Sequence, residues 1–252
     1  MKPAHKILFL PVLALFSCTP GQTEYKTYAD YPVYAEADLW PRYSPKHTDF
    51  SLWSPTAEEI TVSFYQNGHS GEAYHTVPMK EKEPGLWHLR MDGDIEGTYY
   101  TYSIKSKGEW LAETPGIYAQ AVGVNGKRAM VVDMEKTNPE GWEYDGGPEP
   151  DRPNKAIIYE LHVRDLTIHP NAGSSFPGKY TGLVEPGTRG PDGVPTAIDH
   201  MKELGITHVH LLPAFDHYAI DETRLDSAQF NWGYDPQNYN VPEGSFSTDP
   251  FH

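Results

Sequence analysis

His208 and His210 stand two positions apart in a short apolar run, so both imidazoles fall on one face of a predicted strand. Two histidines at this spacing can bind a metal ion. No third ligand accompanies them, and lone histidines in an apolar run more often belong to a protein core. The sequence therefore favours core histidines, and we assign no metal ligand.

Residues 230–236 (Phe-Asn-Trp-Gly-Tyr-Asp-Pro) place an amide, a carboxylate and three aromatic rings in one short segment. Flat aromatic faces with polar edges suit stacking against sugar rings. The alternative is that residues 231–235 form only a structural turn. Composition does not decide between the two, because ordinary β-sheet core accounts for most of the 17 Tyr and 6 Trp.

The net negative charge of the chain argues against one class of binding partner, nucleic acids. The chain has 252 residues and a formal net charge of -15. Such a field repels phosphate backbones, so we expect no nucleic-acid partner.

The first 18 residues have the features of a bacterial lipoprotein signal peptide. Lys2 and Lys6 precede an apolar run at 7–16, which is too short to span a bilayer but suits a secretory signal. The run ends in Ser17 and Cys18, which resembles a lipobox whose cysteine carries lipid after cleavage. A plain signal peptide and a cytosolic N-terminus are the alternatives. We expect an exported, membrane-anchored lipoprotein, periplasmic or on the cell surface, with a tether at 19–44.

A β-rich domain is expected at 45–135. Apolar residues alternate with polar ones at 50–53, 60–64, 86–91, 99–104 and 129–132, with Gly and Pro between the runs. This spacing of short strands is typical of an immunoglobulin-like β-sandwich. Trp53, Trp87 and Trp110 could form a surface platform for a sugar chain; the alternative is that the sandwich only docks against its neighbour.

After a Pro-rich linker at 136–154, the hydrophobic pattern no longer predicts only strands but strands together with a helix. Residues 156–161 form a nearly continuous apolar run, as a strand buried on both faces requires. Thr196 can cap a helix that places Ala197, Met201 and Leu204 on one face, and a second strand follows at 207–212. Strand, helix and strand predict a parallel βαβ unit at the start of the domain 155–252.

Three sets of motifs together resemble the type I pullulanases of the α-amylase superfamily. The segments 52–57, 85–87 and 97–102 resemble the β-sandwich that precedes the barrel in pullulanases, isoamylases and branching enzymes. Residues 159–165 and 205–213 resemble the first two barrel strands. Residues 230–236 are similar to the pullulanase signature Tyr-Asn-Trp-Gly-Tyr-Asp-Pro, with Phe230 in place of the first tyrosine. The resemblance implies a β-sandwich followed by an incomplete (β/α)8 barrel.

The resemblance also implies roles for the signature residues. Tyr234 would stack on the sugar at the cleavage point and Asp235 would order that subsite, while Asn231 and Trp232 would shape the branch-recognising wall. The family's catalytic carboxylates follow later barrel strands, so we expect them downstream and assign none here. Asp165, Asp216 and Asp235 are not spaced as a two-carboxylate site.

The sequence thus predicts a hydrolase of α-1,6-glucosidic linkages in pullulan, starch or glycogen dextrins, of which residues 1–252 alone are inactive. The alternative is a non-catalytic lipoprotein that binds α-glucan. No cofactor is assigned, although the resemblance allows calcium in a full-length enzyme. The expected partners are an α-glucan and, through Cys18, a membrane.

Overall fold

The computed structural model describes residues 25–36, 38–146 and 153–251. Contacts divide the chain into two units, 1–31 and 32–252. In its described part the first unit contains the 3-10 helix η1 (Tyr28–Asp30). The predicted signal segment, Cys18, and positions 147–152 of the predicted linker lie outside the described residues. Within the described ranges, no helix has the length and apolar character needed to cross a membrane.

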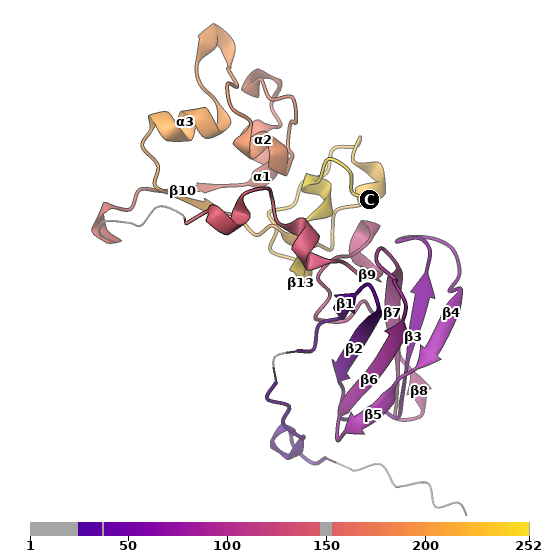
Figure 1. Cartoon of the computed structure of the whole chain (residues 1–252). Coiled ribbons are helices and arrows are strands. Elements are labelled where there is room, and N and C mark those ends of the chain that lie inside the picture. Colours follow the sequence, from indigo (N-terminus) through magenta and orange to yellow (C-terminus); the bar gives the residue numbers. More distant parts are fainter. Residues whose placement is uncertain (1–24, 37, 147–152, 252) are drawn as a thin grey trace, which may run out of the picture. The chain divides into compact units, whose positions relative to one another are not determined.

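Two antiparallel sheets make up the first part of the second unit (Figure 1). One sheet has the order β1-β2-β6-β5 and the other β4-β3-β7-β8, with β9 paired to β7. The strands are β1 (Arg42–Ser44), β2 (His47–Trp53), β3 (Glu59–Tyr65), β4 (His75–Pro78), β5 (Lys80–Glu83), β6 (Leu86–Asp92), β7 (Tyr99–Ser106), β8 (Glu109–Trp110) and β9 (Ala129–Met130).

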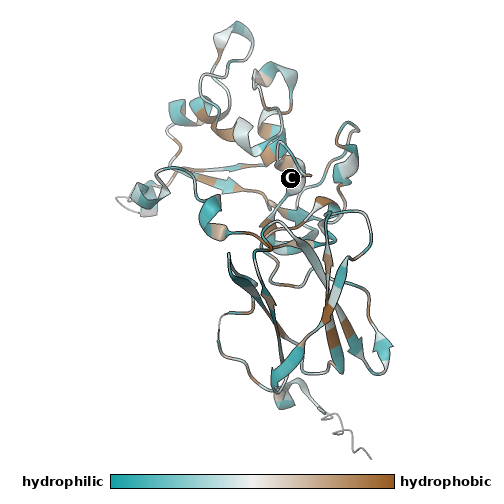
Figure 2. Cartoon of the chain, turned by 45° about the vertical axis from the view of Figure 1, so that its right-hand side comes forward, coloured by the Kyte–Doolittle hydropathy of each residue, from teal (hydrophilic) through white to brown (hydrophobic). Residues whose placement is uncertain are grey.

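The two sheets pack face to face around an aromatic core. Phe50 of β2 meets Phe64 of β3 and Tyr100 of β7 edge-on, with ring centroids 5.7 and 5.0 Å apart. Burying each such ring contributes about 2–3 kcal/mol, which explains why these alternating runs form strands. Figure 2 shows the hydrophobic residues along the same strands. The five predicted strand runs are therefore found, in β2, β3, β6, β7 and β9.

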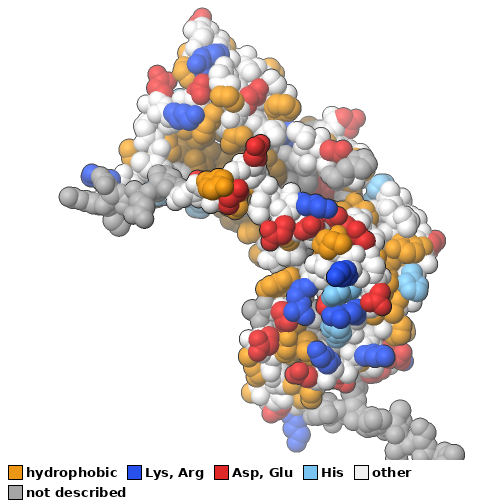
Figure 3. Space-filling view, viewed as in Figure 1, with side chains coloured by type: hydrophobic (Ala, Val, Ile, Leu, Met, Phe, Trp, Pro, Cys, Tyr) orange, Lys and Arg blue, Asp and Glu red, His pale blue; other side chains and the backbone are white. Residues whose placement is uncertain are grey.

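Charged and imidazole side chains cover the outer face of the β1-β2-β6-β5 sheet. Figure 3 shows Lys, Arg and His side chains gathered over the sandwich strands. Asp49, on the face of β2 opposite Phe50, lies among His47, His88 and Arg90. This face is therefore ordered by charge pairing rather than by apolar contact.

The three tryptophans of the sandwich do not form one platform. Trp87 is 7% exposed and belongs to the core, where its indole N–H donates to the carbonyl of Ser54 at 3.1 Å. Trp53 and Trp110 are partly exposed but lie on strands of different sheets. The three-tryptophan surface, one of the two alternatives that the sequence left open, is not formed because β6 turns Trp87 inward.

A parallel strand pair follows the predicted linker. Strand β10 (Ile158–Leu161) pairs with β11 (His208–Leu211), with Ile158 opposite His208. Between them lie α1 (Val163–Thr167), α2 (Tyr180–Val184) and α3 (Ala197–Glu203). The predicted strand-helix-strand order is thus present. The strands are less buried than their apolar runs predict, since Ile158 remains 65% exposed.

Helix α3 differs from its predicted details in two side chains. Thr196 occupies the N-cap position, but its hydroxyl donates to the carbonyl of Ala172 at 2.6 Å instead of capping the helix. Ala197 and Met201 are buried as predicted, whereas Leu204 is half exposed. The tertiary partner at Ala172 therefore competes successfully with the local cap.

His208 and His210 are exposed, so the expectation of core histidines is wrong. The Nδ1 atom of His210 lies 3.3 Å from a carboxylate oxygen of Glu160 on the paired strand β10. All four residues of β11 are exposed, so the structure covers neither face of this strand.

An antiparallel hairpin ties the last part of the chain to the sandwich. Strands β12 (Phe215–His217) and β13 (Pro236–Pro242) pair with each other, and Val241 of β13 joins the sandwich core. The side-chain amide of Asn240 donates to the carbonyl of Ile117 at 3.0 Å.

The remaining 3-10 turns are η2 (Val124–Gly126), η3 (Met134–Thr137), η4 (Trp142–Tyr144), η5 (Pro153–Lys155), η6 (Pro170–Ala172), η7 (Pro191–Gly193), η8 (Glu222–Arg224) and η9 (Gly244–Phe246).

Candidate functional site

Signature residues 230–235 form the end of the loop that joins β12 to β13, and Pro236 is the first residue of β13. Gly233 has φ +90°, and a Cβ atom built there would lie 2.1 Å from the carbonyl oxygen of Pro213, just after β11. A side chain at this position would collide with backbone. The glycine therefore lets the loop lie directly against the carboxyl end of a parallel strand, where ligand sites are commonly found.

Asn231 and Asp235 hold this turn closed. The side-chain amide of Asn231 donates to Asp235 Oδ1 at 2.5 Å, and its Oδ1 accepts from the N–H of Gly233 at 2.9 Å. The second carboxylate oxygen of Asp235 accepts from the N–H of Ala219 at 3.1 Å. The alternative of a structural turn therefore accounts for how Asn231 and Asp235 are arranged.

The aromatic residues of the same loop point into solvent. Trp232 is 61% exposed and Tyr234 is 71% exposed. Phe230 supports the indole edge-on, with centroids 5.8 Å apart. A closed turn that presents two aromatic side chains is suited to stacking against a sugar.

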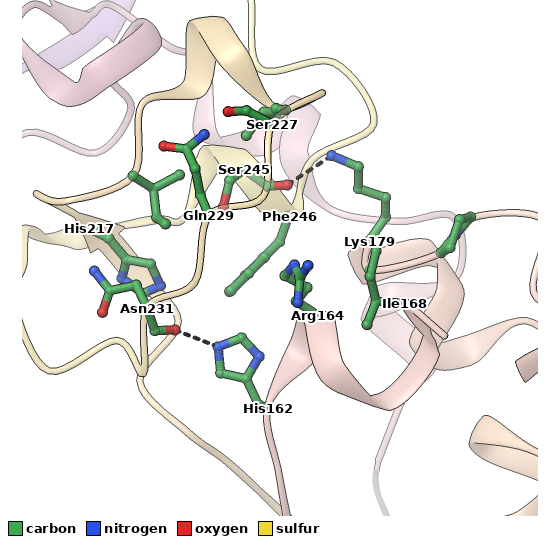
Figure 4. Close-up of a pocket in the computed structure, with 14 residues that line it drawn as sticks. His162, Arg164, Ile168, Lys179, His217, Ser227, Gln229, Asn231, Ser245 and Phe246 are labelled. Atoms are coloured by element: carbon green, nitrogen blue, oxygen red, sulfur yellow. Dashed lines mark hydrogen bonds between the residues drawn. The ribbon is translucent and has the colours of Figure 1, made fainter. Parts of the chain in front are cut away.

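A cavity of about 140 Å³ lies behind the loop (Figure 4). His162, at the end of β10, reaches the carbonyl of Asn231 with Nε2 at 2.8 Å, and the ammonium group of Lys179 donates to the carbonyl of Ser245 at 2.8 Å. Burial lowers the pKa of Lys179 and that of His217, which also lines the cavity. His162 thus fixes the position of the signature loop relative to β10.

The structure brings the four predicted contact residues, Asn231, Trp232, Tyr234 and Asp235, into one turn. The other two aspartates considered in the sequence analysis, Asp165 and Asp216, lie outside this turn. Asp165 lies in α1, half exposed and 3.1 Å from Arg164. Asp216 is 1% exposed within β12.

Asp216 belongs to a buried group of carboxylates that the sequence did not indicate. Asp216, Glu222 and Glu243 each contribute an oxygen that lies within 4.8 Å of the others. Burial raises the pKa of Asp216 to about 6 and that of Glu222 to about 7. A separation near 5 Å occurs in retaining glycosidases, but these side chains are at most 5% exposed and cannot meet a sugar. No local spacing links the three positions, so only the tertiary fold reveals the group.

A family model and the curated relatives both indicate similarity to enzymes of the pullulanase and isoamylase type. Residues 37–117 match carbohydrate-binding module 48 (isoamylase N-terminal domain). The pullulanase of Bacillus subtilis is 35% identical, over 88% of this chain and 30% of the relative. Pullulanase A of Streptococcus pneumoniae is 29% identical, over 81% of this chain and 18% of the relative.

Solved structures agree with these relatives. The pullulanase of Paenibacillus barengoltzii, in complex with maltohexaose and α-cyclodextrin, superposes with a TM-score of 0.84 and 50% identity, covering 87% of this chain and 34% of that one. The pullulanase of Bacillus acidopullulyticus gives a TM-score of 0.81 and 42% identity, covering 86% of this chain and 26% of that one. The chain spans about a third or less of the length of these proteins. It is therefore homologous, over most of its length, to pullulanases, and its residues 37–117 match carbohydrate-binding module 48.

Proposed function

We propose that this chain is the glucan-recognising N-terminal portion of a glycoside hydrolase that cleaves α-1,6-glucosidic linkages in pullulan, starch or glycogen dextrins. The observation that carries the proposal is the closed turn at 231–235, which presents Trp232 and Tyr234 to solvent. The similarity to pullulanases over most of the chain supports the same assignment.

The parallel pair β10–β11 would be the first two strands of a (β/α)8 barrel. Substrate sites of such barrels lie at the carboxyl ends of the strands. The signature loop packs against Pro213, two residues after β11, and is hydrogen-bonded to His162, directly after β10. Both contacts support a site for the exposed aromatic side chains at the carboxyl end of the strand pair, where the mouth of such a barrel would lie.

Bond cleavage is proposed for a full-length enzyme rather than for residues 1–252 alone. Retaining hydrolysis needs one carboxyl group as acid and another as nucleophile, about 5 Å apart and open to the substrate. In the described parts of the chain, the close carboxylates Asp216, Glu222 and Glu243 are buried. We assign to this portion the binding and orientation of the glucan, through Trp232 and Tyr234.

An α-glucan is the proposed partner of the chain. The Paenibacillus barengoltzii pullulanase was solved with maltohexaose and α-cyclodextrin, and residues 37–117 match a carbohydrate-binding module. The signature loop adds a second surface with exposed rings. Both features favour binding of α-linked glucose chains.

Maltohexaose binding tests the role of the loop. Calorimetric titration of the chain should give binding that Trp232→Ala and Tyr234→Ala each weaken about tenfold, because removal of one stacked ring costs about 1 kcal/mol or more. Tyr144→Ala is the matched control, since Tyr144 is also exposed but lies in η4. Equal maltohexaose affinity in the unaltered chain and the three variants would show that the loop does not contact the glucan.

Export as a lipoprotein is a separate part of the proposal. It is supported by the apolar run at 7–16 and by Cys18, the chain's single cysteine. Lipidation would anchor the glucan-binding portion to a membrane.

A further inference from the structure

Three carboxylates from separate segments meet beneath the β12–β13 hairpin. Asp216 lies in β12, Glu222 begins η8 and Glu243 directly follows β13. Their exposed fractions are 1%, 5% and 1%. Because carboxylate groups repel one another when charged, a buried group of three requires compensation.

Neutral donors supply only part of that compensation. Asp216 Oδ2 accepts from the side-chain amide of Asn238, and Glu243 Oε2 accepts from the N–H of His217, both at 2.6 Å. Glu222 Oε2 accepts from the N–H of Asn125, also at 2.6 Å. Among the Lys and Arg side chains that the structure describes, none forms an ion pair with these three acids, although Lys179 and Lys127 lie near enough to act on them electrostatically.

One oxygen of the group has no partner at all. Glu222 Oε1 is buried and accepts no hydrogen bond. The backbone of Gly244 lies beside it, close enough to favour the charged carboxylate, but without acceptable hydrogen-bond geometry. Leaving a buried carboxylate oxygen unpaired costs free energy, and a cation bound beside it would offset that cost.

The side chain of His217 is buried beside the carboxylates and has no hydrogen-bond partner of its own. Its Nδ1 lies 3.7 Å from Glu243 Oε2, and neither ring nitrogen has a hydrogen-bond partner. An unpartnered buried imidazole beside the carboxylates is a second sign that a ligand belongs in this place.

We propose that Asp216, Glu222 and Glu243 bind one divalent cation, and that this cation is Ca²⁺. The shared donors are carboxylate oxygens, which hard cations prefer. Ca–O distances of about 2.3–2.6 Å allow oxygens on opposite sides of the ion to lie about 5 Å apart, whereas Mg²⁺ demands a tighter octahedron. The three oxygens all lie within 4.8 Å of one another, so they can meet around one Ca²⁺ ion.

Two glycines allow the backbone to close around this site. A Cβ atom at Gly126 would lie 2.4 Å from Asp216 Oδ2, and one at Gly244 would lie 2.2 Å from Glu222 Oε1. Any larger residue would push against the carboxylates. The close backbone excludes bulk water, which strengthens the attraction between the carboxylates and an ion.

The ion would join both ends of the signature loop. Asp216 precedes the loop, Glu222 lies within it and Glu243 follows β13. A bound cation would therefore hold the loop that carries Trp232 and Tyr234. This role concerns loop order and is independent of whether a glucan binds.

Titration of the chelator-treated chain with Ca²⁺ alone tests the site without any sugar. Calorimetry should detect one strong site per chain, and saturating Ca²⁺ should raise the thermal unfolding midpoint by roughly 5–10 °C. Mg²⁺ should give a smaller rise. Absence of both binding and stabilisation, or tighter binding of Zn²⁺ or Mn²⁺ than of Ca²⁺, would overturn the assignment.

Variants then locate the ion. Glu222→Gln keeps the size of the side chain and an acceptor for the Asn125 N–H, and should weaken Ca²⁺ binding at least about tenfold. Glu203→Gln, at an exposed acid of α3, should bind as the unaltered chain does. Asp216→Asn gives an independent measurement if Glu222→Gln is poorly folded. Unchanged Ca²⁺ affinity in a folded variant of either acid places the ion elsewhere and contradicts the proposal.

Discussion

Asn125 and Glu222, 97 positions apart, hydrogen-bond each other in both directions. The N–H of Asn125 donates to Glu222 Oε2 at 2.6 Å, and the N–H of Glu222 donates to Asn125 Oδ1 at 2.8 Å. Asn125 also donates from its side-chain amide to Asp221 at 3.1 Å. This reciprocal pair joins η2, next to the sandwich, to the loop that leads to the signature residues.

Removing the Asn125 side chain should therefore loosen that junction. Asn125→Gly loses the two side-chain hydrogen bonds and should lower the free energy of unfolding by about 1–3 kcal/mol. Asn125→Ala should lose roughly 1 kcal/mol more, because residue 125 has φ 61° and alanine is strained there. Urea unfolding of both variants measures the difference. Equal stability of the two variants would contradict the strain argument.

Gly233 offers a sharper steric test of the loop. Gly233→Ala combines a positive φ with a clash against the Pro213 carbonyl, so we expect a loss of roughly 2–4 kcal/mol and weaker maltohexaose binding. Gly187→Ala is the matched control: its φ is +80°, but a Cβ there meets no atom within 4 Å. The control should lose about 1 kcal/mol. Similar losses at both positions in urea unfolding would show that the loop does not depend on its approach to β11.

Acid should weaken the sandwich through Asp49. Two hydrogen bonds of 2.8 Å from the Arg90 guanidinium hold the pKa of Asp49 below its ordinary value of 3.8. A carboxyl whose pKa is lower in the folded state stabilises the fold above the unfolded pKa, and this contribution is lost as pH falls through the folded pKa. Unfolding midpoints should therefore decline below about pH 4.

Arg90→Met should make that acid decline shallower, because it removes the group that lowers the Asp49 pKa. Arg42→Met is the control, since Arg42 pairs with Asp38 rather than with Asp49. Midpoints measured across the acid range compare the two. An unchanged pH profile in Arg90→Met would assign the acid decline to other carboxylates.

Lipidation is tested in cells that express the chain. Cys18→Ser should abolish incorporation of labelled palmitate and release the protein from the membrane fraction. Ser17→Ala keeps a small residue before the cysteine and should leave labelling intact. Label retained in Cys18→Ser would contradict the lipoprotein assignment.

The sandwich strands could be predicted because burial of one face imposes a two-residue period on the sequence. Phe50 and Val62 follow that period and lie in the core. Strand β5 could not be found in this way, since Lys80–Glu83 is exposed at every position and exists only by pairing with β6. The sequence left the face of Trp87 open, because an aromatic side chain suits either the core or a surface.

The candidate site was predictable only where its residues are adjacent in sequence. Asn231, Trp232, Tyr234 and Asp235 form one turn, so a local motif sufficed to find them. Their roles in glucan binding stay a prediction. The carboxylates of Asp216, Glu222 and Glu243 have no such local signal, because strand pairing and the contact with η2 bring them together.

Replacing the equivalent region of the Paenibacillus barengoltzii pullulanase with residues 32–251 of this chain tests the central claim most directly. The hybrid should release reducing sugar from pullulan, whereas this chain alone should not, and Tyr234→Ala should reduce the hybrid's activity about tenfold or more. A folded hybrid that binds maltohexaose but leaves pullulan intact would contradict the account and favour a non-catalytic glucan-binding protein.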